Sequence, residues 1–381
     1  MEKLALTFPI LKFFGGAELS AIRIANHLSK TNKIDLIYCG DKIHKEIRLQ
    51  ISKKINLINL KSKNLILNYL IRNYILIAQC YIIFYLNVNG DKYKKIISTS
   101  GEIVNNKKCY QLINFPFYSL NFFDYLSLGT KSFEIHKFIS RFLIISICRI
   151  IFNINSKSLK RNVTFCNSKW TAKKYKEVYN YEKNIFYNYC TFTLKSTKNI
   201  SFKKFEKKKN NFVILGRVTR DKKIHHFIKI FKKLSDNLNK NNLQLTIIGP
   251  IPDNRYFEKC KALAQGYNVI FTGFVNERKK INIMNNSKYG IHLFRNEHFG
   301  MAPCEMQNNN MIVFVYKNGG VIEFIRNKRQ HFLNFNQLYE NIFKMILQKN
   351  TRLISHKLML KNKKLIKRNS YFKKLDKILD V

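Results

Sequence analysis

The segment from Asn296 to Glu323 constrains the fold of this chain more than any other part of it. An apolar stretch, residues 289–294, precedes the segment, and a second one, residues 311–316, lies inside it. A glycine-containing turn and a helix start separate the two stretches, and a glycine pair follows the second. The order strand, turn, helix and strand is that of an α/β unit, in which backbone N–H groups at a helix start can face a phosphate. We therefore expect an α/β fold.

Two glutamates lie eight positions apart in this segment. Glu297 falls in the turn, and Glu305 falls in the helix that we expect to follow it. If the turn places Glu297 just before the helix and Glu305 in its first turns, the two lie at the same end of that helix. We therefore expect both carboxylates to face one cleft.

The same residues carry a resemblance to a known family. The turn reads Asn-Glu-His-Phe-Gly-Met from Asn296 to Met301, and seven residues separate its glutamate from Glu305. With the glycine pair, Gly319 and Gly320, after them, these residues resemble the signature of the retaining glycosyltransferases of family 4. The fuller match is to the mannosyltransferases that extend lipid-linked oligosaccharides. The resemblance implies a GT-B fold, with two Rossmann-like domains facing each other across a cleft.

The length and composition suit such a two-domain chain. With 381 residues, of which 46% are hydrophobic, the chain can bury two cores of ordinary size. By resemblance, residues 1–193 form an acceptor-side Rossmann-like domain, which the last helix, about residues 365–381, rejoins. Residues 194–210 are expected to be a polar linker. Residues 211–364 are expected to form the nucleotide-sugar-binding domain.

A second glycine pair, Gly15 and Gly16, lies near the amino terminus. It follows an apolar strand, residues 3–8, and precedes apolar residues at helical spacing over 17–29. A strand, a glycine turn and a helix open a Rossmann-like half, although a glycine pair by itself also fits a plain tight turn. The resemblance implies that this loop approaches the donor diphosphate, since residues without side chains allow close backbone approach.

Asn114 lies at the end of an expected strand over residues 110–115, in the sequence Asn-Phe-Pro. Family members often carry His-Phe-Pro at the corresponding position on the acceptor side of the cleft. Asparagine there argues against a proton-handling role, although its amide can still hydrogen-bond a sugar hydroxyl.

Arg217 and Lys222 lie in a loop between an apolar strand, residues 212–215, and helical spacing over residues 224–234. Arginine offers a planar fork for phosphate oxygens and lysine offers a point charge, both beyond the carboxyl end of a strand. In so basic a chain the alternative is a pair of solvated charges. The pattern Gly-Arg, four residues and Lys resembles the donor-phosphate motif of the family.

The resemblance assigns the remaining donor contacts. Glu297 is expected to bind hydroxyls of the transferred sugar and Glu305 the ribose, while Arg217 and Lys222 neutralise the leaving diphosphate. Further donor contacts are expected from backbone amides beside the sugar and phosphates and from the turn that lies against the nucleobase; these positions are Phe299, Gly300, Met301, Val275 and Glu277.

The formal net charge of +46 is extreme. Lysine is spread along the whole chain with many Ile and Asn residues, which is typical of a compositional bias, but such a charge also favours anionic surfaces. Two apolar stretches, residues 64–86 and 138–154, are interrupted by Arg or other polar residues. We expect buried or interfacial helices there, with ordinary domain helices as the alternative, and thus a possible peripheral contact with an anionic membrane surface.

The numbers and spacing of the Cys and His residues indicate the redox compartment and argue against a metal site. The eight Cys are scattered without a Cys-x-x-Cys pair, which fits a reducing, cytoplasmic location, and no secretory signal is visible. No Asp-x-Asp occurs, and the nine His show no ligand spacing. We therefore expect no metal and no cofactor, with Arg217 and Lys222 in the place of a divalent cation.

The leading hypothesis is a metal-independent retaining glycosyltransferase that moves a hexose, with mannose from GDP-mannose favoured, to a glycan or polyprenyl-linked acceptor. One alternative is a catalytically inactive relative that acts as a partner subunit. Another is a basic nucleic-acid-binding protein, but the chain lacks an RNA-recognition signature, a zinc finger and an aromatic stacking ribbon. We therefore expect no nucleic-acid partner.

Overall fold

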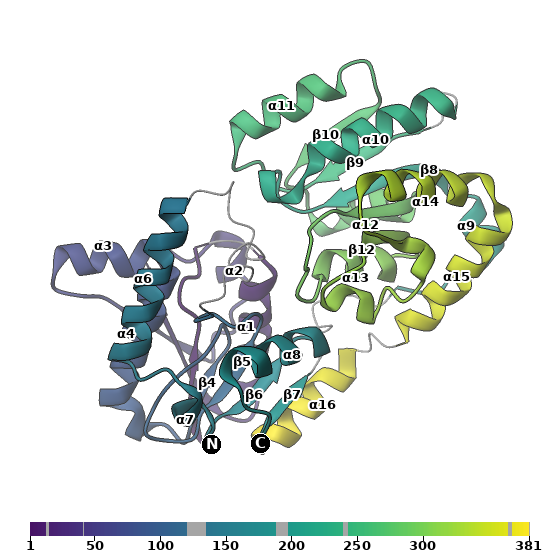
Figure 1. The fold of residues 1–381 in the computed structure, drawn as a ribbon. Helices are drawn as coiled ribbons and strands as arrows, with labels where there is room; N and C mark the ends of the chain where they lie inside the picture. Colours follow the sequence, from purple (N-terminus) through teal and green to yellow (C-terminus); the bar gives the residue numbers. More distant parts are fainter. Residues whose placement is uncertain are drawn as a thin grey trace. The chain divides into compact units, whose positions relative to one another are not determined.

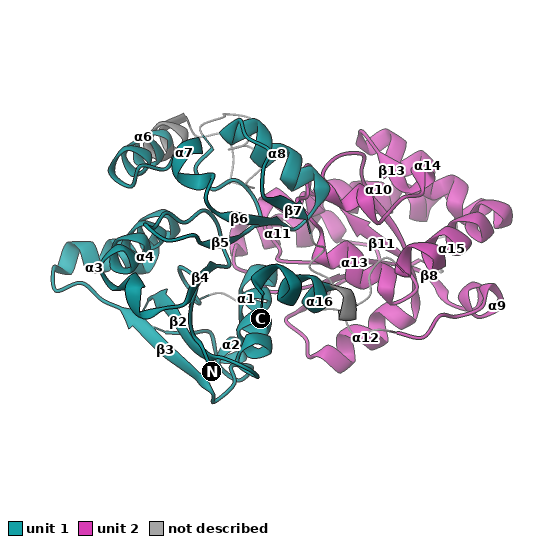
Figure 2. Cartoon of the chain, turned by 90° about the horizontal axis from the view of Figure 1, so that it is seen from below, with its two compact units in different colours: residues 1–126, 134–193, 368–381 teal, residues 127–133, 194–367 magenta. Residues whose placement is uncertain are grey.

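The computed structural model describes all of the chain except residues 13–14, 41, 120–134, 188–196, 239–242, 365–367 and 381, together with the side chains of residues 135–141 and 368–370. The described chain divides into two compact units (Figure 2). Unit 1 comprises residues 1–126, 134–193 and 368–381, and unit 2 comprises residues 127–133 and 194–367. Each unit is an α/β structure with its own sheet (Figure 1).

Unit 1 is built on a seven-stranded parallel sheet with the order β3-β2-β1-β4-β5-β6-β7. Leu4 of the first strand pairs with Ile34 on one side and Lys95 on the other. This interior strand is buried after its first residue, as expected where helices cover both faces of a parallel sheet. The strands are β1 (Lys3–Thr7), β2 (Lys33–Cys39), β3 (Ile55–Leu60), β4 (Lys95–Ser98), β5 (Tyr110–Ile113), β6 (Val163–Cys166) and β7 (Ile185–Tyr187).

The helices of unit 1 follow the strands in the alternating order of a doubly wound fold. The chain end returns to this unit, where Lys95 Nζ lies 2.8 Å from the carbonyl oxygen of Asp380 and His27 Nε2 lies 2.8 Å from Asp376 Oδ1. The helices are α1 (Gly16–Leu28), α2 (Lys45–Arg48), α3 (Leu65–Asn73), α4 (Ile75–Asn89), α6 (Ile135–Ile151), α7 (Ser156–Leu159), α8 (Lys169–Tyr179) and α16 (Arg368–Leu379).

The apolar stretch at residues 64–86 forms two helices, α3 and α4, which meet at Tyr74. Among the described residues, no single helix has the length and apolar character of a membrane span. The two helices meet that standard only when taken together, across a bend of 114°.

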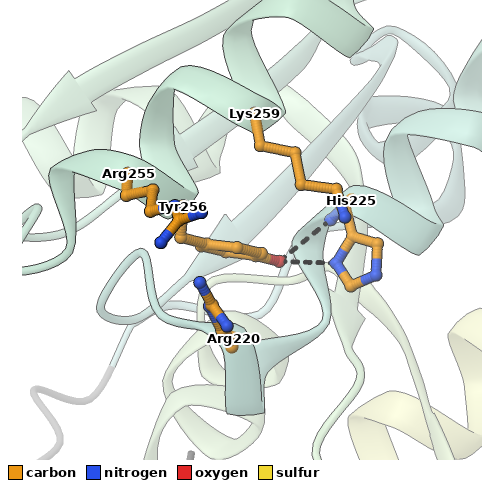
Figure 3. Close-up of a pocket in the computed structure, with 5 residues that line it drawn as sticks. All are labelled: Arg220, His225, Arg255, Tyr256 and Lys259. Carbon is orange, nitrogen blue, oxygen red and sulfur yellow. Dashed lines mark hydrogen bonds between the residues drawn. The ribbon is translucent and has the colours of Figure 1, made fainter.

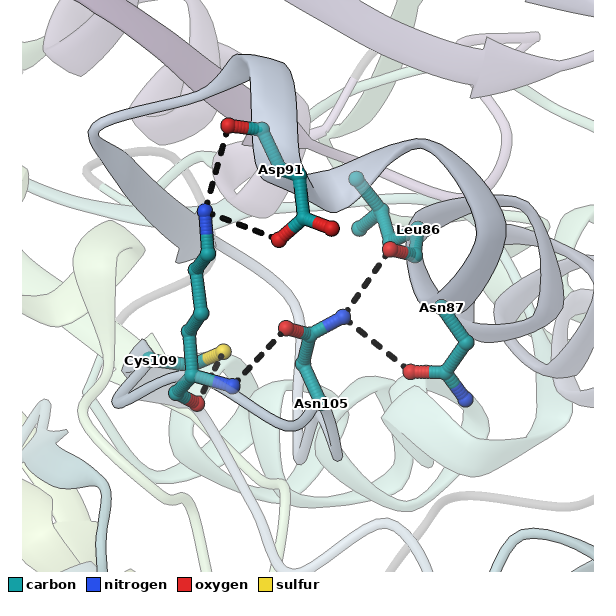
Figure 4. A network of polar contacts seen from close by, with 6 residues as sticks. Leu86, Asn87, Asp91, Asn105 and Cys109 are labelled. Carbon is teal, nitrogen blue, oxygen red and sulfur yellow. Dashed lines mark hydrogen bonds and ion pairs between the residues drawn. The ribbon is translucent and has the colours of Figure 1, made fainter.

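Asn105 holds the end of α4 against the segment before β5. Its Nδ2 donates to the Leu86 carbonyl at 2.9 Å, and its Oδ1 accepts from Lys107 N at 3.0 Å (Figure 4).

Unit 2 is built on a six-stranded parallel sheet with the order β10-β9-β8-β11-β12-β13. The chain runs outward from β8 to β10 and then crosses back to β11 on the other side of β8. Its strands are β8 (Lys209–Leu215), β9 (Leu245–Ile248), β10 (Val269–Gly273), β11 (Ser287–His292), β12 (Ile312–Tyr316) and β13 (His331–Phe332). In parallel sheets, ligands bind beyond the carboxyl ends of the strands where the winding reverses, which here means beyond β8 and β11.

Helices alternate with these strands as the apolar spacing predicts. α9 and the first residues of β8 lie in the segment that we expected to be a linker. The helices of unit 2 are α9 (Phe202–Glu206), α10 (Ile224–Asn237), α11 (Asn254–Ala264), α12 (Glu277–Asn285), α13 (Met301–Asn308), α14 (Phe335–Leu347) and α15 (Lys349–Lys363). Two parallel sheets with alternating helices confirm the expected α/β fold class.

Candidate active site

Glu297 lies in the loop after β11, and His292, the last residue of that strand, holds its carboxylate. His292 Nε2 donates to Glu297 Oε2 at 2.8 Å, and the two side chains are 7% and 19% exposed. Burial acts to raise the pKa of Glu297, but the hydrogen bond and charge of His292 and the charge of Lys222 outweigh it and hold the pKa at about 2. The carboxylate therefore stays ionised at neutral pH.

Gly319 locks the backbone of Glu297. The two residues form a parallel bridge, and Gly320 N donates to the Glu297 carbonyl at 2.7 Å. Gly319 has a φ of +93°, and a Cβ added there would lie 2.3 Å from the Glu297 carbonyl oxygen. Only glycine fits both the dihedral angle and the space. The pair Gly319 and Gly320 thus positions Glu297.

The loop then turns into α13 at Gly300, which caps the helix with a φ of +90°. A Cβ at Gly300 would lie 3.1 Å from Glu297 Cγ, so the helix start and the glutamate are in close contact. Phe299 is buried against Phe324, with ring centroids 5.2 Å apart, which leaves its backbone as the part able to contact a ligand. Met301 is the first residue of the helix, whose amino end carries partial positive charge.

Lys222 reaches from the loop after β8 toward the loop after β11. Its Nζ lies 4.3 Å from the ring centroid of Phe294 and 3.8 Å from Asp221 Oδ2, and its charge contributes to the low pKa of Glu297. Because β8 and β11 are neighbours, the charge of Lys222 acts on the loop that carries Glu297. Arg217 lies on the same loop with its side chain exposed to solvent.

Glu305, on α13, forms an ion pair with Lys280 of α12. The same Lys280 Nζ lies 2.9 Å from Glu277 Oε2, so one lysine joins both glutamates. Burial acts to lower the pKa of Lys280, but the two carboxylates outweigh it and raise the pKa. Val275, half-buried, precedes α12 in the turn after β10. The positions expected to contact the nucleoside, namely Val275, Glu277 and Glu305, are therefore joined in one part of unit 2.

Three expected residues belong to unit 1. Gly15 caps α1 and Gly16 begins it, with the Glu18 carboxylate so close that a Cβ at Gly15 would lie 2.6 Å from Glu18 Oε2. Asn114 follows β5 and is held by Asn167, whose Nδ2 donates to the Asn114 carbonyl at 3.3 Å and to its Oδ1 at 3.4 Å. Gly15 and Asn114 both follow carboxyl ends of strands in the sheet of unit 1.

Within the described ranges of the chain, no group of three or more His, Cys, Asp or Glu side chains is placed to hold a metal ion. The positive groups beside Glu297 and Glu305 are Lys222, Lys280 and the amino end of α13. These groups can bind an anionic ligand without a metal ion between them.

Residues 196–352 match the family model described as glycosyl transferases group 1. The match begins at the start of unit 2 and includes the loop after β8, α12, the loop after β11 and α13. The chain carries a group 1 glycosyltransferase domain. The expectation of a glycosyltransferase is thereby confirmed.

Several solved structures share the fold over the whole chain. WaaG, a glycosyltransferase involved in lipopolysaccharide biosynthesis, matches with a TM-score of 0.68 and 15% identity, over 98% of this chain and 99% of WaaG. HepE from Anabaena, solved with UDP-glucose, matches with a TM-score of 0.68 and 12% identity over all of both chains. A glycosyltransferase from Rickettsia africae matches with a TM-score of 0.63 and 17% identity, over 99% of this chain and 98% of that protein. A sequence search of curated proteins gave no match.

Sequence reasoning overlooked three residues of this glycosyltransferase that hold expected site residues. His292 binds Glu297, Lys280 binds Glu305, and Asn167 binds Asn114. A signal existed for His292, which ends an apolar strand five residues before the glutamate. Lys280 carried no signal, because it is one of many lysines on an exposed helix.

Proposed function

We propose that this glycosyltransferase transfers a hexose from a nucleoside diphosphate sugar to a glycan or polyprenyl-linked acceptor, with retention of anomeric configuration and without a metal ion. One observation carries the proposal: an ionised Glu297, largely withdrawn from solvent and held by His292 after β11, is stabilised by the charge of Lys222, whose ammonium group lies over Phe294 in the same loop. A negative group for the sugar and a positive group for the phosphate thus act at the same edge of the unit 2 sheet.

The positive groups act on the leaving diphosphate. Transfer breaks the bond between the anomeric carbon and the phosphate oxygen, and negative charge builds up on the diphosphate as it departs. Lys222, Arg217 and the amino end of α13 stabilise this charge, which lowers the barrier because their interaction strengthens as the bond breaks. Such groups can replace a divalent cation.

Glu297 acts on the transferred sugar. With a pKa of about 2 it cannot serve as a proton donor at neutral pH, so it accepts hydrogen bonds from sugar hydroxyls. Its negative charge also favours the oxocarbenium-like character that the anomeric carbon acquires in the transition state. The bridge to Gly319 fixes the backbone of Glu297, so little reorganisation is needed during transfer.

The pair of Glu305 and Lys280 acts on the nucleoside. Glu305 accepts hydrogen bonds from the ribose hydroxyls, and Lys280 holds its carboxylate in place. The turn around Val275 and Glu277 lies against the base. The donor favoured by the sequence Asn296 to Met301 is GDP-mannose, whereas HepE was solved with UDP-glucose, so the two donors are the first to compare.

The experiment is a panel of nucleotide sugars, including GDP-mannose and UDP-glucose, tested for donor hydrolysis and for a stabilising shift in melting temperature. Lys222→Ala should reduce donor turnover by about 100-fold or more while the circular dichroism spectrum stays unchanged. Lys229→Ala, on the exposed face of α10, is the matched control. A protein that binds no nucleotide sugar, or a Lys222→Ala variant with full activity, would overturn the proposal.

We further propose that unit 1 contacts an anionic membrane surface peripherally through α3, α4 and α6. Large apolar side chains are exposed on these helices: Leu65 is 84%, Ile66 73% and Ile150 80% exposed. α4 packs against both α3 and α6, so the three helices lie together in unit 1 (Figure 1). Exposed Lys61 and Lys63 precede α3. Exposed apolar residues beside lysines suit an interface with anionic lipid.

Co-sedimentation with phosphatidylcholine vesicles, with and without phosphatidylglycerol, tests this surface. The double variant Leu65→Ser/Ile66→Ser should lose most of the binding to anionic vesicles. Leu49→Ser/Leu333→Ser removes two apolar side chains that are 72% and 63% exposed elsewhere and should bind as the unaltered chain does. Equal loss of vesicle binding in both variants would contradict a defined membrane surface and indicate nonspecific hydrophobic adsorption.

A further inference from the structure

Unit 2 has a cavity of about 320 Å³ beside α10 and α11. Five residues line it, with Arg220 in the turn after β8, His225 at the start of α10, and Arg255, Tyr256 and Lys259 along the first turns of α11 (Figure 3). Small-molecule sites have volumes of roughly 300–1,000 Å³, so the cavity suffices for a small ligand. None of these residues has a role in the transfer mechanism proposed above.

The lining is cationic. Arg220, Arg255 and Lys259 carry permanent charges, and Lys259 and Arg255 reach the cavity from α11 while Arg220 approaches from the opposite side (Figure 3). The acidic side chain nearest to Arg220 is Asp253, whose Oδ2 lies 3.8 Å from Arg220 Nε. Asp253 also accepts a hydrogen bond from Tyr256 N at 3.0 Å, so it caps α11 and offsets only one of the three charges.

Tyr256 and His225 are hydrogen-bonded to each other in the lining. Tyr256 is 3% exposed, and its hydroxyl accepts a hydrogen bond from His225 N at 3.2 Å and lies 2.8 Å from His225 Nδ1. Burial, together with the positive charges of His226 and Lys259, lowers the pKa of His225 to about 4. His225 is therefore neutral at physiological pH and adds a polar wall without further repulsion between cations.

The cavity is separate from the groups that serve the donor. Lys222 points from the loop after β8 toward Phe294 and Glu297, on the β11 side. Arg220, two residues earlier, points toward Asp253 and α11, on the β9 side. One loop therefore presents two cations in different directions, and only one of them lies beside the glutamates.

We propose that this cavity binds a phosphate group other than the donor diphosphate. Two arginine forks and a lysine ammonium match the oxygens of a phosphate monoester or pyrophosphate, which accept charge-assisted hydrogen bonds from several sides. The group can come from a soluble phosphate compound or from the phosphorylated end of a lipid, since both present the same oxygens.

Calorimetric titration of the whole chain with pyrophosphate, in the presence of saturating UDP or GDP to fill the donor site, tests the cavity. Arg255→Gln/Lys259→Gln should weaken binding by about tenfold or more, since charge-assisted hydrogen bonds to the phosphate are lost. Lys261→Gln/Lys344→Gln, which removes the same charge from exposed positions on α11 and α14, should bind as the unaltered chain does. Lys222→Ala should also keep this binding, so failure of the donor proposal would not affect the result.

Several outcomes would overturn the assignment. These are unchanged pyrophosphate binding in Arg255→Gln/Lys259→Gln, equal weakening in the control double variant, and no pyrophosphate binding once UDP or GDP fills the donor site. Phosphatidylcholine vesicles with and without phosphatidic acid then identify the source. A drop in vesicle binding in Arg255→Gln/Lys259→Gln indicates a lipid phosphate, whereas unchanged vesicle binding with weakened pyrophosphate binding indicates a soluble one.

Discussion

His292 Nε2 lies 2.8 Å from Glu297 Oε2, and both side chains are largely withdrawn from solvent. One residue ends a strand and the other lies in the loop that follows, so the sheet itself fixes the position of the imidazole relative to the carboxylate. The glutamate is therefore ionised and oriented before any ligand arrives. The role that we propose for Glu297, and the first prediction, depend on this pair.

Glu297→Gln should lower kcat by about 100-fold or more, because the amide keeps the shape of the carboxylate but loses the negative charge beside the sugar. His292→Ala should lower kcat roughly tenfold, about the effect of losing one hydrogen bond to a charged group. It should also raise the pKa of Glu297 and so move the acid limb of the pH–rate profile upward. A pH–rate profile identical to that of the unaltered enzyme would show that His292 does not set the charge of Glu297.

Lys280→Gln should raise the KM for the donor by about tenfold with a smaller effect on kcat, because Lys280 orients Glu305 for binding and is not expected to touch the reacting bond. Initial-rate kinetics over a range of donor concentrations measures both constants. Lys279→Gln changes the exposed neighbour on α12 and should leave both constants unchanged. A fall in kcat at unchanged KM would contradict a role in nucleoside binding.

Gly319→Ala should destabilise the protein by about 1–3 kcal/mol from backbone strain, with a further loss from the collision with the Glu297 carbonyl. Gly266→Ala is a matched control, since Gly266 also has a positive φ, +81°, but nothing within 4 Å of an added Cβ. Urea unfolding followed by circular dichroism compares the two variants. Equal destabilisation would mean that the close approach to Glu297 contributes nothing.

Glu102→Gln should change the pH dependence of stability of unit 1. Burial raises the pKa of Glu102 to about 7, although hydrogen bonds from Tyr179 and Phe117 N oppose the rise. The usual pKa of the carboxyl is 4.5, so the folded state holds more protons than the unfolded state between pH 4.5 and 7. Stability from this group therefore falls as pH rises through that interval, by at most about 1.4 kcal/mol per pH unit.

The amide in Glu102→Gln does not titrate. The free energy of unfolding of this variant, relative to that of the unaltered chain, should therefore rise from pH 4.5 to 7 and then level off. Fluorescence of the single tryptophan, Trp170 in unit 1, reports urea unfolding of that unit. Glu258→Gln, on the exposed side of α11, should show no such trend. A parallel pH dependence in the Glu102→Gln variant and the unaltered chain would rule out titration of Glu102.

Local structure was largely predictable from the sequence. The strand expected over residues 311–316 and the helix expected over residues 17–29 lie within one residue of β12 and α1, because apolar spacing and turn residues set them locally. Asn310 adopts a left-handed φ of +58° after α13, as expected for an asparagine that ends a helix. The strand β3 was missed because Asn56 and Asn59 interrupt its apolar residues. In the structure these two side chains bind Asp35 Oδ1 and the Gly40 carbonyl of the neighbouring segment.

Sequence alone determined the α/β class, the loops that carry Arg217, Lys222 and Glu297, and the glycine pair beside the site, because each depends on a few neighbouring residues. Only the tertiary structure decided which of sixty-nine Lys and Arg residues contact a carboxylate or line a cavity. Lys280 meets Glu305 because α12 packs beside the strand that leads to α13, and Arg220 meets α11 because β9 lies next to β8. Such contacts follow from strand order and helix packing over many residues, so local spacing cannot reveal them.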